Sequence, residues 1–302
     1  MPSQRRVRGV SWSLVILGVG LVGCAPEHGD PAPTAGTAAP APLDENDQLG
    51  QDPGAAAGAS GSEEGAPENP GLTQGELDER LRWAAWGNDI DTVAQLIQWG
   101  ADVNAQDSTQ QSAYLIATSE GRDELLRLTL EHGADVSDLD SWNGTGLIRA
   151  AERGHWEVAG TLIRAGVDVH HVNRVGYQAI HEAVIFGRDD PTYHAAVRVL
   201  VAGGASLGTP SVTEGQTPLQ MAQSLGFSGQ IRILEALDRE APEQPETALL
   251  EAATSGDADA LTLALRAGAA VDTHDPEGRT VLEIAEGSGN LAAATVLRAL
   301  GG

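Results

Sequence analysis

Short apolar stretches with helical spacing recur along most of the chain. Val93, Leu96 and Ile97 fall on one face of a helix, and a leucine-rich stretch at 125–130 repeats this pattern one unit later. Pairs of small residues, such as Ala150-Ala151, precede these stretches and allow neighbouring helices to approach closely. The pattern therefore predicts pairs of short helices, the second of each pair carrying an apolar stripe on its inner side.

A glycine-led phrase punctuates these pairs. Its leading glycines are separated by 33, 33, 38 and 64 residues. The phrase reads Gly100-Ala-Asp-Val-Asn, Gly133-Ala-Asp-Val-Ser, Gly166-Val-Asp-Val-His, Gly204-Ala-Ser-Leu-Gly and Gly268-Ala-Ala-Val-Asp. We expect each glycine to lie just past the second helix, where a left-handed backbone conformation suits it. The residues that follow are then expected to turn outward into a hairpin.

A second phrase marks the start of each unit. It reads Ser112-Ala-Tyr-Leu, Thr145-Gly-Leu-Ile, Gln178-Ala-Ile-His, Thr217-Pro-Leu-Gln, Thr247-Ala-Leu-Leu and Thr280-Val-Leu-Glu. A Ser or Thr side chain in this position accepts a hydrogen bond from the first turn of a helix. The phrase therefore predicts where the first helix of each pair begins.

In this register the two phrases resemble the ankyrin repeat, which has a period of 33 residues and a Thr-Pro-Leu-His-x-Ala start. The resemblance extends over about 228 residues, 75–302. It implies an all-α repeat solenoid, an ankyrin stack of about seven helix-turn-helix units with hairpin fingers. The expected units are 75–106, 107–139, 140–172, 173–211, 212–241, 242–274 and 275–302, and the first and last are degenerate, as expected of caps.

Two units depart from the regular length. The fourth carries extra residues from Gly187, and Asp190-Pro191 within them predicts an N-cap and first residue of its second helix. The fifth lacks the glycine phrase between Ala236 and Pro245. We expect the groove of the stack to be interrupted at that point.

The first residues read as an export signal. Arg5, Arg6 and Arg8 precede an uncharged apolar run at 9–23, which is shorter than the about 20 residues needed to span a bilayer. The run ends in Leu21-Val22-Gly23-Cys24, which resembles the bacterial lipobox. By that resemblance, residues 1–23 are a lipoprotein signal peptide and Cys24 is acylated, with chains such as palmitate. An ordinary secretory signal with an incidental cysteine is the alternative.

The stretch at 24–74 differs in composition from the rest. It is rich in Ala, Pro, Gly and Glu, contains no Arg, and has almost no large apolar side chain. Such a segment cannot bury enough surface to offset its ordering entropy, so we expect a disordered acidic tether behind Cys24. Ala25 rather than Asp follows Cys24, which by resemblance to Gram-negative lipoproteins favours an outer-membrane location facing the periplasm.

Charge and residue usage exclude several functions. The chain has 43 acidic and 18 basic residues, all of the latter Arg, and a net charge of −25. Such a charge repels phosphates, which argues against nucleic-acid binding. Because Lys is absent, neither a P-loop lysine nor a Schiff-base lysine can be present.

We find no catalytic, cofactor-binding or metal-binding constellation. His181-Glu182 begins like a zinc-protease helix, but the second His is missing, and His181 falls on the structural histidine of the repeat. The same reading applies to His155. The adjacent His170-His171 would diverge on an extended finger rather than share a metal.

The resemblance also implies a partner-binding surface, since ankyrin stacks usually bind through finger tips and the exposed side of the first helices. The positions in this register are Trp86, Gln111, Trp142, Arg153, Tyr177, Phe186, Gln216 and Arg279. We expect the aromatic residues among them to be exposed anchors, Trp142 foremost. For Trp86 and Phe186, packing on a neighbouring repeat is the alternative.

These features favour a membrane-anchored protein-protein interaction module of the bacterial cell envelope, with an unknown periplasmic protein as its partner. Two specific versions are neutralisation of a periplasmic toxin and support of a periplasmic enzyme. An enzyme or small-molecule receptor built on an ankyrin scaffold is the alternative function. A purely structural spacer is a third possibility.

Overall fold

The computed structural model describes residues 68–302, and these residues form fourteen helices and no β-strand. The first helices of the pairs are α1 (Gln74–Gly87), α3 (Ala113–Ser119), α5 (Gly146–Glu152), α7 (Ala179–Ile185), α9 (Pro218–Leu225), α11 (Pro245–Ser255) and α13 (Val281–Gly287). The second helices are α2 (Ile90–Gln98), α4 (Asp123–Glu131), α6 (Trp156–Arg164), α8 (Pro191–Ala202), α10 (Ser228–Leu237), α12 (Ala258–Arg266) and α14 (Leu291–Ala299). Each predicted unit contains one pair, so the predicted repeat solenoid is confirmed.

Most of the predicted helix boundaries agree with the structure. The side chains of Ser112, Thr145, Thr217 and Thr280 each accept a hydrogen bond from the first turn of the helix that follows. Asp190 caps α8 with Pro191 at its first position, as expected. The five phrase glycines have φ between 85° and 101°, in the left-handed region.

One predicted boundary is wrong. Thr247 lies inside α11, which begins two residues earlier at Pro245. Repeats two, three, four, five and seven have a hairpin in front of their first helix, whereas repeat six follows the segment 238–244 directly. Without a hairpin to set the boundary, the fixed backbone angle of Pro245 begins the helix instead.

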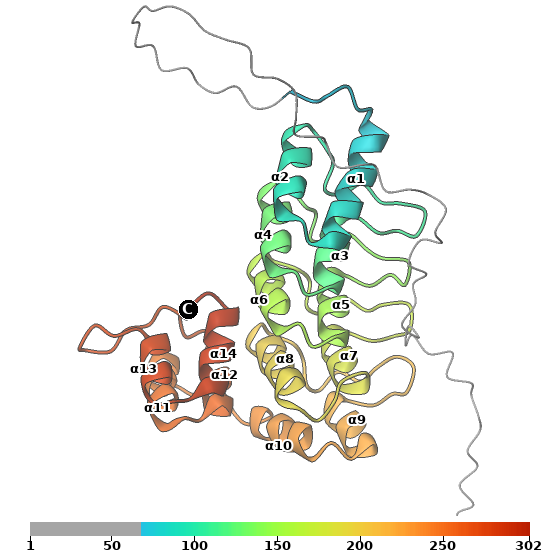
Figure 1. The fold of residues 1–302 in the computed structure, drawn as a ribbon. Helices are drawn as coiled ribbons and strands as arrows, with labels where there is room; N and C mark the ends of the chain where they lie inside the picture. The colour runs from blue at the N-terminus through green and yellow to red at the C-terminus, as the bar shows by residue number, and fades with distance from the viewer. Residues whose placement is uncertain (1–67) are drawn as a thin grey trace, which may run out of the picture. The chain divides into compact units, whose positions relative to one another are not determined.

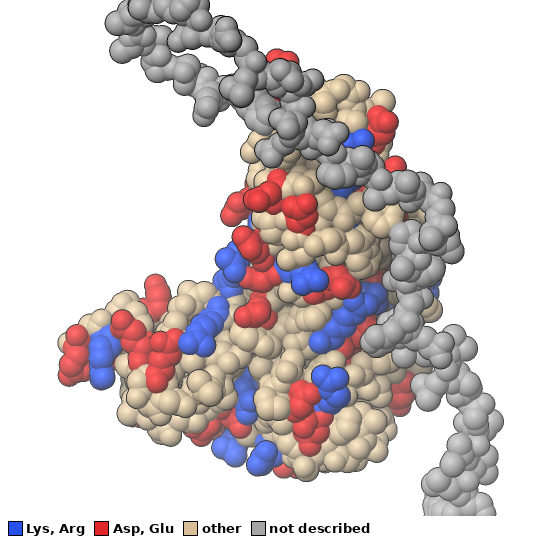
Figure 2. Space-filling model, in the orientation of Figure 1, with Lys and Arg blue, Asp and Glu red and all other residues tan. Residues whose placement is uncertain are grey.

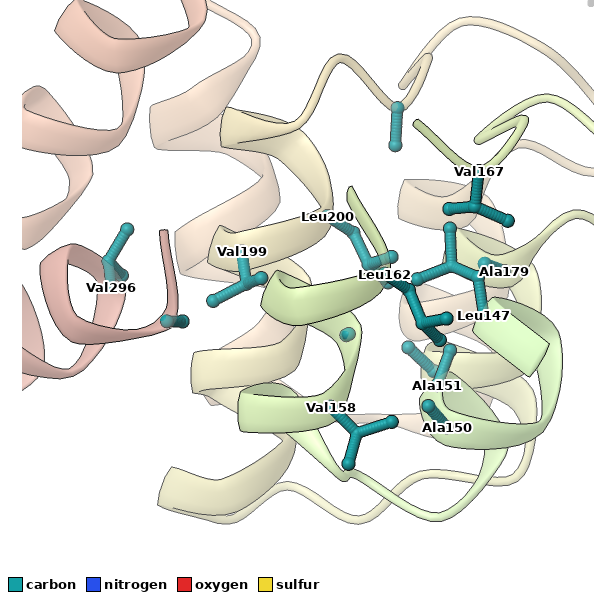
Figure 3. Close-up of a cluster of buried hydrophobic side chains, with 14 of the residues drawn as sticks. Leu147, Ala150, Ala151, Val158, Leu162, Val167, Ala179, Val199, Leu200 and Val296 are labelled. Atoms are coloured by element: carbon teal, nitrogen blue, oxygen red, sulfur yellow. The ribbon is translucent and has the colours of Figure 1, made fainter. Parts of the chain in front are cut away.

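Repeats one to five form a regular stack. The helices α1, α3, α5, α7 and α9 form an inner row, and α2, α4, α6, α8 and α10 form an outer row (Figure 1). Between the rows, Leu147, Leu162 and Leu200 point toward one another (Figure 3), and each is 0% exposed. This shared core explains why no single repeat could bury its apolar face alone.

The first repeat acts as a cap through side chains of α1. In the interior of the stack, Asn104 bonds the backbone of the next repeat at Gly133 and Asp135. At the free end, α1 provides the same kind of bond to residues 100–105, which end its own repeat: Gln74 donates to the Gly100 carbonyl, Asp78 accepts from the Asp102 amide, and Arg82 donates to the Ala105 carbonyl. Backbone groups at the edge of the stack are thereby satisfied.

The last two repeats leave this stack and turn back along its outer side (Figure 1). Helix α12 packs against α10 and α8, and α14 packs against α8 and α6, while α11 and α13 pack against one another. The interruption expected at Ala236–Pro245 is therefore present. The return of repeats six and seven onto repeats three to five was not predicted.

Close contacts hold the returning repeats in place. Gly160 of α6 lies so near α14 that a Cβ atom there would collide with the carbonyl group of Ala299. Arg164 donates to that same carbonyl. Figure 3 shows Val199 on the side of α8 that faces Val296 of α14, and both side chains are fully buried. The outer row of the stack thus has apolar contacts on both sides at repeats three and four.

Residues 1–67 lie outside the described part of the chain, and with them the predicted signal peptide, Cys24 and the predicted tether as far as residue 67. Within residues 68–302, no helix is both long and apolar enough to cross a membrane.

Candidate functional site

Trp142 lies at the tip of the finger that precedes α5. Its side chain is 41% exposed, as predicted. Its backbone is fixed on both sides: Asp140 accepts from the amides of Trp142 and Gly144, and the Trp142 carbonyl accepts from Arg174 of the next finger at 2.8 Å. A large aromatic side chain is therefore presented to solvent from a rigid turn, which suits a binding anchor.

A second exposed aromatic group lies on α1. Trp86 is 38% exposed, so the predicted exposure is correct, and Trp83, one helical turn earlier, is 52% exposed. Residues three apart lie next to each other on the same face of a helix, so Trp83 and Trp86 form one exposed apolar surface on α1. The sequence analysis missed Trp83.

The repeat register explains why Trp83 is exposed. The equivalent positions are Ile116, Arg149, Glu182 and Met221 in repeats two to five, Glu251 in repeat six and Ile284 in repeat seven. In each repeat with a hairpin before its first helix, the side chain is buried or nearly so, whereas Glu251 is exposed. Repeats one and six have no hairpin in this place among the described residues, so Trp83 is left uncovered. The missing hairpin phrase before Gln74 was the signal that could have revealed it.

Four other predicted site residues occupy less open positions. Arg153 is half-buried and donates to the Ser119 carbonyl and the Glu120 carboxylate, both at 2.8 Å, which ties repeat three to repeat two. Phe186 is half-buried and packs on the edge of the core. Gln111 and Gln216 are also half-buried. Their side chains can take part in a binding surface only at its margins.

Arg279 lies in the finger of repeat seven and is exposed. Its guanidinium pairs with Asp275 of the same finger at 2.7 Å. Because repeat seven has turned away from the regular stack, Arg279 does not continue the row of fingers that contains Trp142. The structure therefore does not bring it together with the other predicted residues.

The expected exposure of Tyr177 is wrong. Its side chain is 5% exposed, its ring stacks on His181 at 6.2 Å between centroids, and its hydroxyl donates to Glu214 of the next finger. Fingers pack side by side, so a residue directly before the first helix is covered by the following finger. Trp142 lies farther from its helix, at the tip, and escapes this cover.

A buried ionisable cluster lies behind the fingers of repeats three and four. Arg149 bridges Asp140 at 3.2 Å and Glu152 at 3.0 Å, and Asn173 donates to one oxygen of Glu182 at 2.5 Å. The other Glu182 oxygen is buried without a partner among the described residues. Burial, aided by the nearby negative charge of Glu152, raises the pKa of Glu182 to about 8. At neutral pH this carboxyl is therefore mainly protonated.

The histidines singled out earlier are structural. His181 is 0% exposed; its Nδ1 accepts from the Gln178 amide, and its Nε2 lies 3.0 Å from the Thr209 carbonyl oxygen. Burial lowers the pKa of His181, which keeps the ring neutral. His155 contacts the Ser119 carbonyl through Nε2 at 3.1 Å. Across residues 68–302, no group of three or more His, Cys, Asp or Glu side chains could hold a metal ion.

On the face drawn in Figure 2, charged side chains do not form one large patch of a single sign. Figure 2 shows acidic side chains spread over the drawn face, with arginine side chains between them. The exposed tryptophans are therefore the most distinctive surface features of the regular stack.

Comparisons with known proteins agree with this architecture. A protein-family model described as ankyrin repeats (3 copies) matches residues 81–173. The ankyrin repeat protein YahD of Escherichia coli (strain K12) is 30% identical over 186 residues, which cover 54% of this chain and 91% of YahD.

A solved ankyrin structure is similar over half of the chain. The ankyrin repeat protein EF0377 is 32% identical over 55% of this chain and 85% of its own, with a TM-score of 0.52. An ankyrin repeat domain from Acinetobacter baumannii AYE is 42% identical over 51% of this chain and 79% of its own, with a TM-score of 0.48. On its repeat phrases, its helix pairs and the identity to YahD, the chain belongs to the ankyrin repeat family.

Proposed function

We propose that this chain is a lipid-anchored protein of the bacterial cell envelope that binds another protein through Trp83, Trp86 and Trp142. Ankyrin repeat proteins are generally non-catalytic scaffolds suited to protein-protein interaction. The observation that carries the proposal is the exposure of three tryptophans, 38–52%, on the first three repeats. Tryptophan is enriched among residues that dominate binding energy, and these side chains are not needed to fill the core.

The character of the partner follows from this surface. An exposed indole favours an apolar pocket on the partner. The net charge of −25 on this chain favours basic residues around that pocket. Association should therefore weaken as salt is added, because charges separated by more than a Debye length, about 10 Å at 0.1 M, are screened.

Loss of capture in a tryptophan variant tests this binding face. The full chain would be crosslinked in envelope extracts and compared with a variant carrying Trp83→Ala, Trp86→Ala and Trp142→Ala. We expect the variant to lose the captured protein. Val212→Ser is the matched control, because Val212 is 76% exposed on another finger and is outside the proposed face. Equal capture by the tryptophan variant and the wild type would argue against this face.

The anchor part of the proposal rests on Leu21-Val22-Gly23-Cys24 and the positively charged residues before it. Several acyl chains on Cys24 would attach the protein stably to the membrane, whereas a single acyl chain gives only marginal, reversible binding. Ala25 favours the outer membrane. The expected result is palmitate labelling that Cys24→Ser abolishes, with release of the chain from the membrane fraction. Unchanged labelling of Cys24→Ser would refute the anchor while leaving the binding face standing.

Within this function, the partner is either a toxin that is neutralised in the periplasm or an enzyme that is supported there. Protection of cells from a toxin encoded beside this gene would favour the first. Loss of a neighbouring enzyme's activity on deletion of this gene would favour the second. An enzyme function for this chain itself has less support, because the ionisable cluster around Glu182 is buried and closed to substrates.

A further inference from the structure

A cleft opens where the last repeat meets the outer row of the stack. It has a volume of about 390 Å³, within the range of small-ligand pockets. Its walls come from α6, α8 and α14, so it exists only because repeat seven has returned onto repeats three and four. The lining residues are Trp156, Pro191, Thr192, His194, Ala195, Arg198, Leu291, Ala292 and Thr295.

The lining of this cleft differs in composition from the acidic chain as a whole. None of its lining residues is acidic, although the chain has 43 acidic residues against 18 basic ones, whereas Arg198 and His194 are both in the lining. The partners of these two side chains, Asp259 and Asp189, lie outside the lining residues. Arg198 is thus the charged group that an anion in the cleft would meet, and no carboxylate is among the lining residues, although Asp259 pairs with the same guanidinium.

Arg198 retains unused hydrogen-bonding capacity. Its Nε donates to Asp259 at 2.7 Å, and its two terminal nitrogens have no acceptor among residues 68–302. The side chain is only 13% exposed, so the guanidinium is held in place by α12 on one side and borders the cleft. A guanidinium with its terminal nitrogens free can bind a carboxylate, which accepts two parallel N–H hydrogen bonds.

Apart from His194, Thr192 and Thr295, the remaining lining residues are apolar. Leu291, at the first position of α14, is 76% exposed, and Trp156, at the first position of α6, is half-buried. An apolar side chain placed between them would cover the exposed leucine. Burial of apolar surface contributes roughly 25 cal/mol per Å², so this wall can add to the affinity that Arg198 provides.

We propose that this cleft binds a short peptide segment of a partner protein in which an apolar side chain adjoins a carboxylate. The apolar side chain lies between Trp156 and Leu291, and the carboxylate accepts from Arg198. Because the cleft is on the outer side of the stack, it is separate from the tryptophan face on the inner helices and fingers. The segment would also bridge α8 and α14 and thereby hold repeat seven against the stack.

Fluorescence polarisation with labelled pentapeptides tests this site on the full chain. The first probe ends in Ala-Val-Leu with a free terminal carboxylate, the second is its terminal amide, and the third is an amidated peptide with an internal Leu-Asp pair. We expect saturable binding of the first or the third probe. If only the first binds, the carboxylate is a chain terminus, and if only the third binds, it is an acidic side chain.

The decisive variant is Leu291→Ser, since Leu291 is largely exposed and its replacement leaves the core unchanged. We expect binding to weaken at least about tenfold, equivalent to about 1.4 kcal/mol. Val212→Ser, a change at an equally exposed valine, should bind as the wild type does. Arg198→Gln should also weaken binding, with circular dichroism as the check that the returning repeats remain folded.

Three results would overturn the proposal: no binding of either carboxylate probe, binding of the Leu-terminated amide as tight as that of the free acid, or unchanged binding by Leu291→Ser. None of these outcomes bears on the tryptophan face, which Val212→Ser and Leu291→Ser both leave intact.

Discussion

Repeats one to five and repeats six and seven contain the same phrases but are stacked differently. In the first region, each inner helix packs on the next, and a hairpin covers the base of each first helix from repeat two onward. In the second region, α11 follows the segment 238–244 without a hairpin, and α12 and α14 pack on the backs of α8, α10 and α6. A repeat phrase therefore specifies a helix pair, whereas the connection before it specifies where that pair goes.

The difference has a functional consequence. The regular stack has free finger tips and a free inner-helix face, which hold the exposed tryptophans. The returning repeats cover the outer row and create the cleft beside Arg198. One chain thus presents two unlike surfaces, one on each side of the stack.

The largest effect is expected from separating the two regions. The fragment 242–302 contains only two repeats, and a stack needs about three or more to bury its core. We expect it to be unfolded on its own, with little helical signal by circular dichroism. The fragment 68–241 should retain its helical signal, since it holds five repeats. A stably helical 242–302 fragment would mean that the second region does not depend on its contact with α6 and α8.

Tyr177→Ala should strongly destabilise the regular stack. Its side chain is 5% exposed and packs between two fingers, so truncation leaves a cavity and costs about 3 kcal/mol. Denaturant unfolding of the full chain measures this loss. Tyr177→Phe is the companion variant, because it removes only the hydroxyl that donates to Glu214 and should cost clearly less.

Gly160→Ala tests the contact between the two regions. The added methyl group would collide with Ala299, so we expect a loss of roughly 1–3 kcal/mol in the free energy of unfolding. Gly75→Ala is the matched control: this glycine is also helical, but it has open space around it, so the change should stabilise by roughly 0.5–1 kcal/mol. Equal effects of the two substitutions would show that α14 does not pack tightly on α6.

Glu182→Gln should change how stability depends on pH. An unfolded glutamate releases its proton near 4.5, whereas the pKa of folded Glu182 is about 8, so the wild type loses stability as pH rises from about 4.5 to about 8. The glutamine removes this loss. Its advantage over the wild type should be small at pH 4 and reach on the order of 1 kcal/mol or more at pH 8.

Glu251→Gln is the control for this pH effect, because Glu251 holds the same register position in repeat six and is exposed. It should leave the pH dependence as in the wild type. A Glu182→Gln advantage that is the same at pH 4 and pH 8 would contradict the assignment of a protonated buried carboxyl.

The sequence was sufficient for features that are local to one repeat. The phrase glycines, the caps Ser112, Thr145, Thr217 and Thr280, and the start of α8 at Pro191 depend on neighbouring residues, and the structure agrees with each. The return of the last repeats depends on contacts such as Gly160 with Ala299, which are distant in sequence and have no phrase that reports them. For the same reason the cleft could not be predicted.

The candidate binding residues show the same division. The exposure of Trp142 and Trp86 follows from their place in the repeat, and it was predicted. Tyr177 was wrongly expected to be exposed, because its place within one repeat does not show that the next finger covers it. Trp83 was missed because its exposure depends on the cover from a hairpin, which residues 68–73 do not form before α1.

The smallest effect on stability, and the most direct test of function, is expected at the tryptophans. Trp142→Ala should change the free energy of unfolding by no more than about 0.5 kcal/mol, because the side chain is exposed. Thermal or denaturant unfolding of this variant establishes that any loss of binding is not a loss of fold.

The decisive measurement is photocrosslinking in living cells from benzoylphenylalanine placed, one at a time, at Trp83, Trp86 and Trp142, with the exposed Arg232 of α10 as the reference position. Our account predicts that the three tryptophan positions crosslink to the same envelope protein and that position 232 does not. Absence of a crosslink from all three tryptophan positions, or an equal crosslink from position 232, would contradict it.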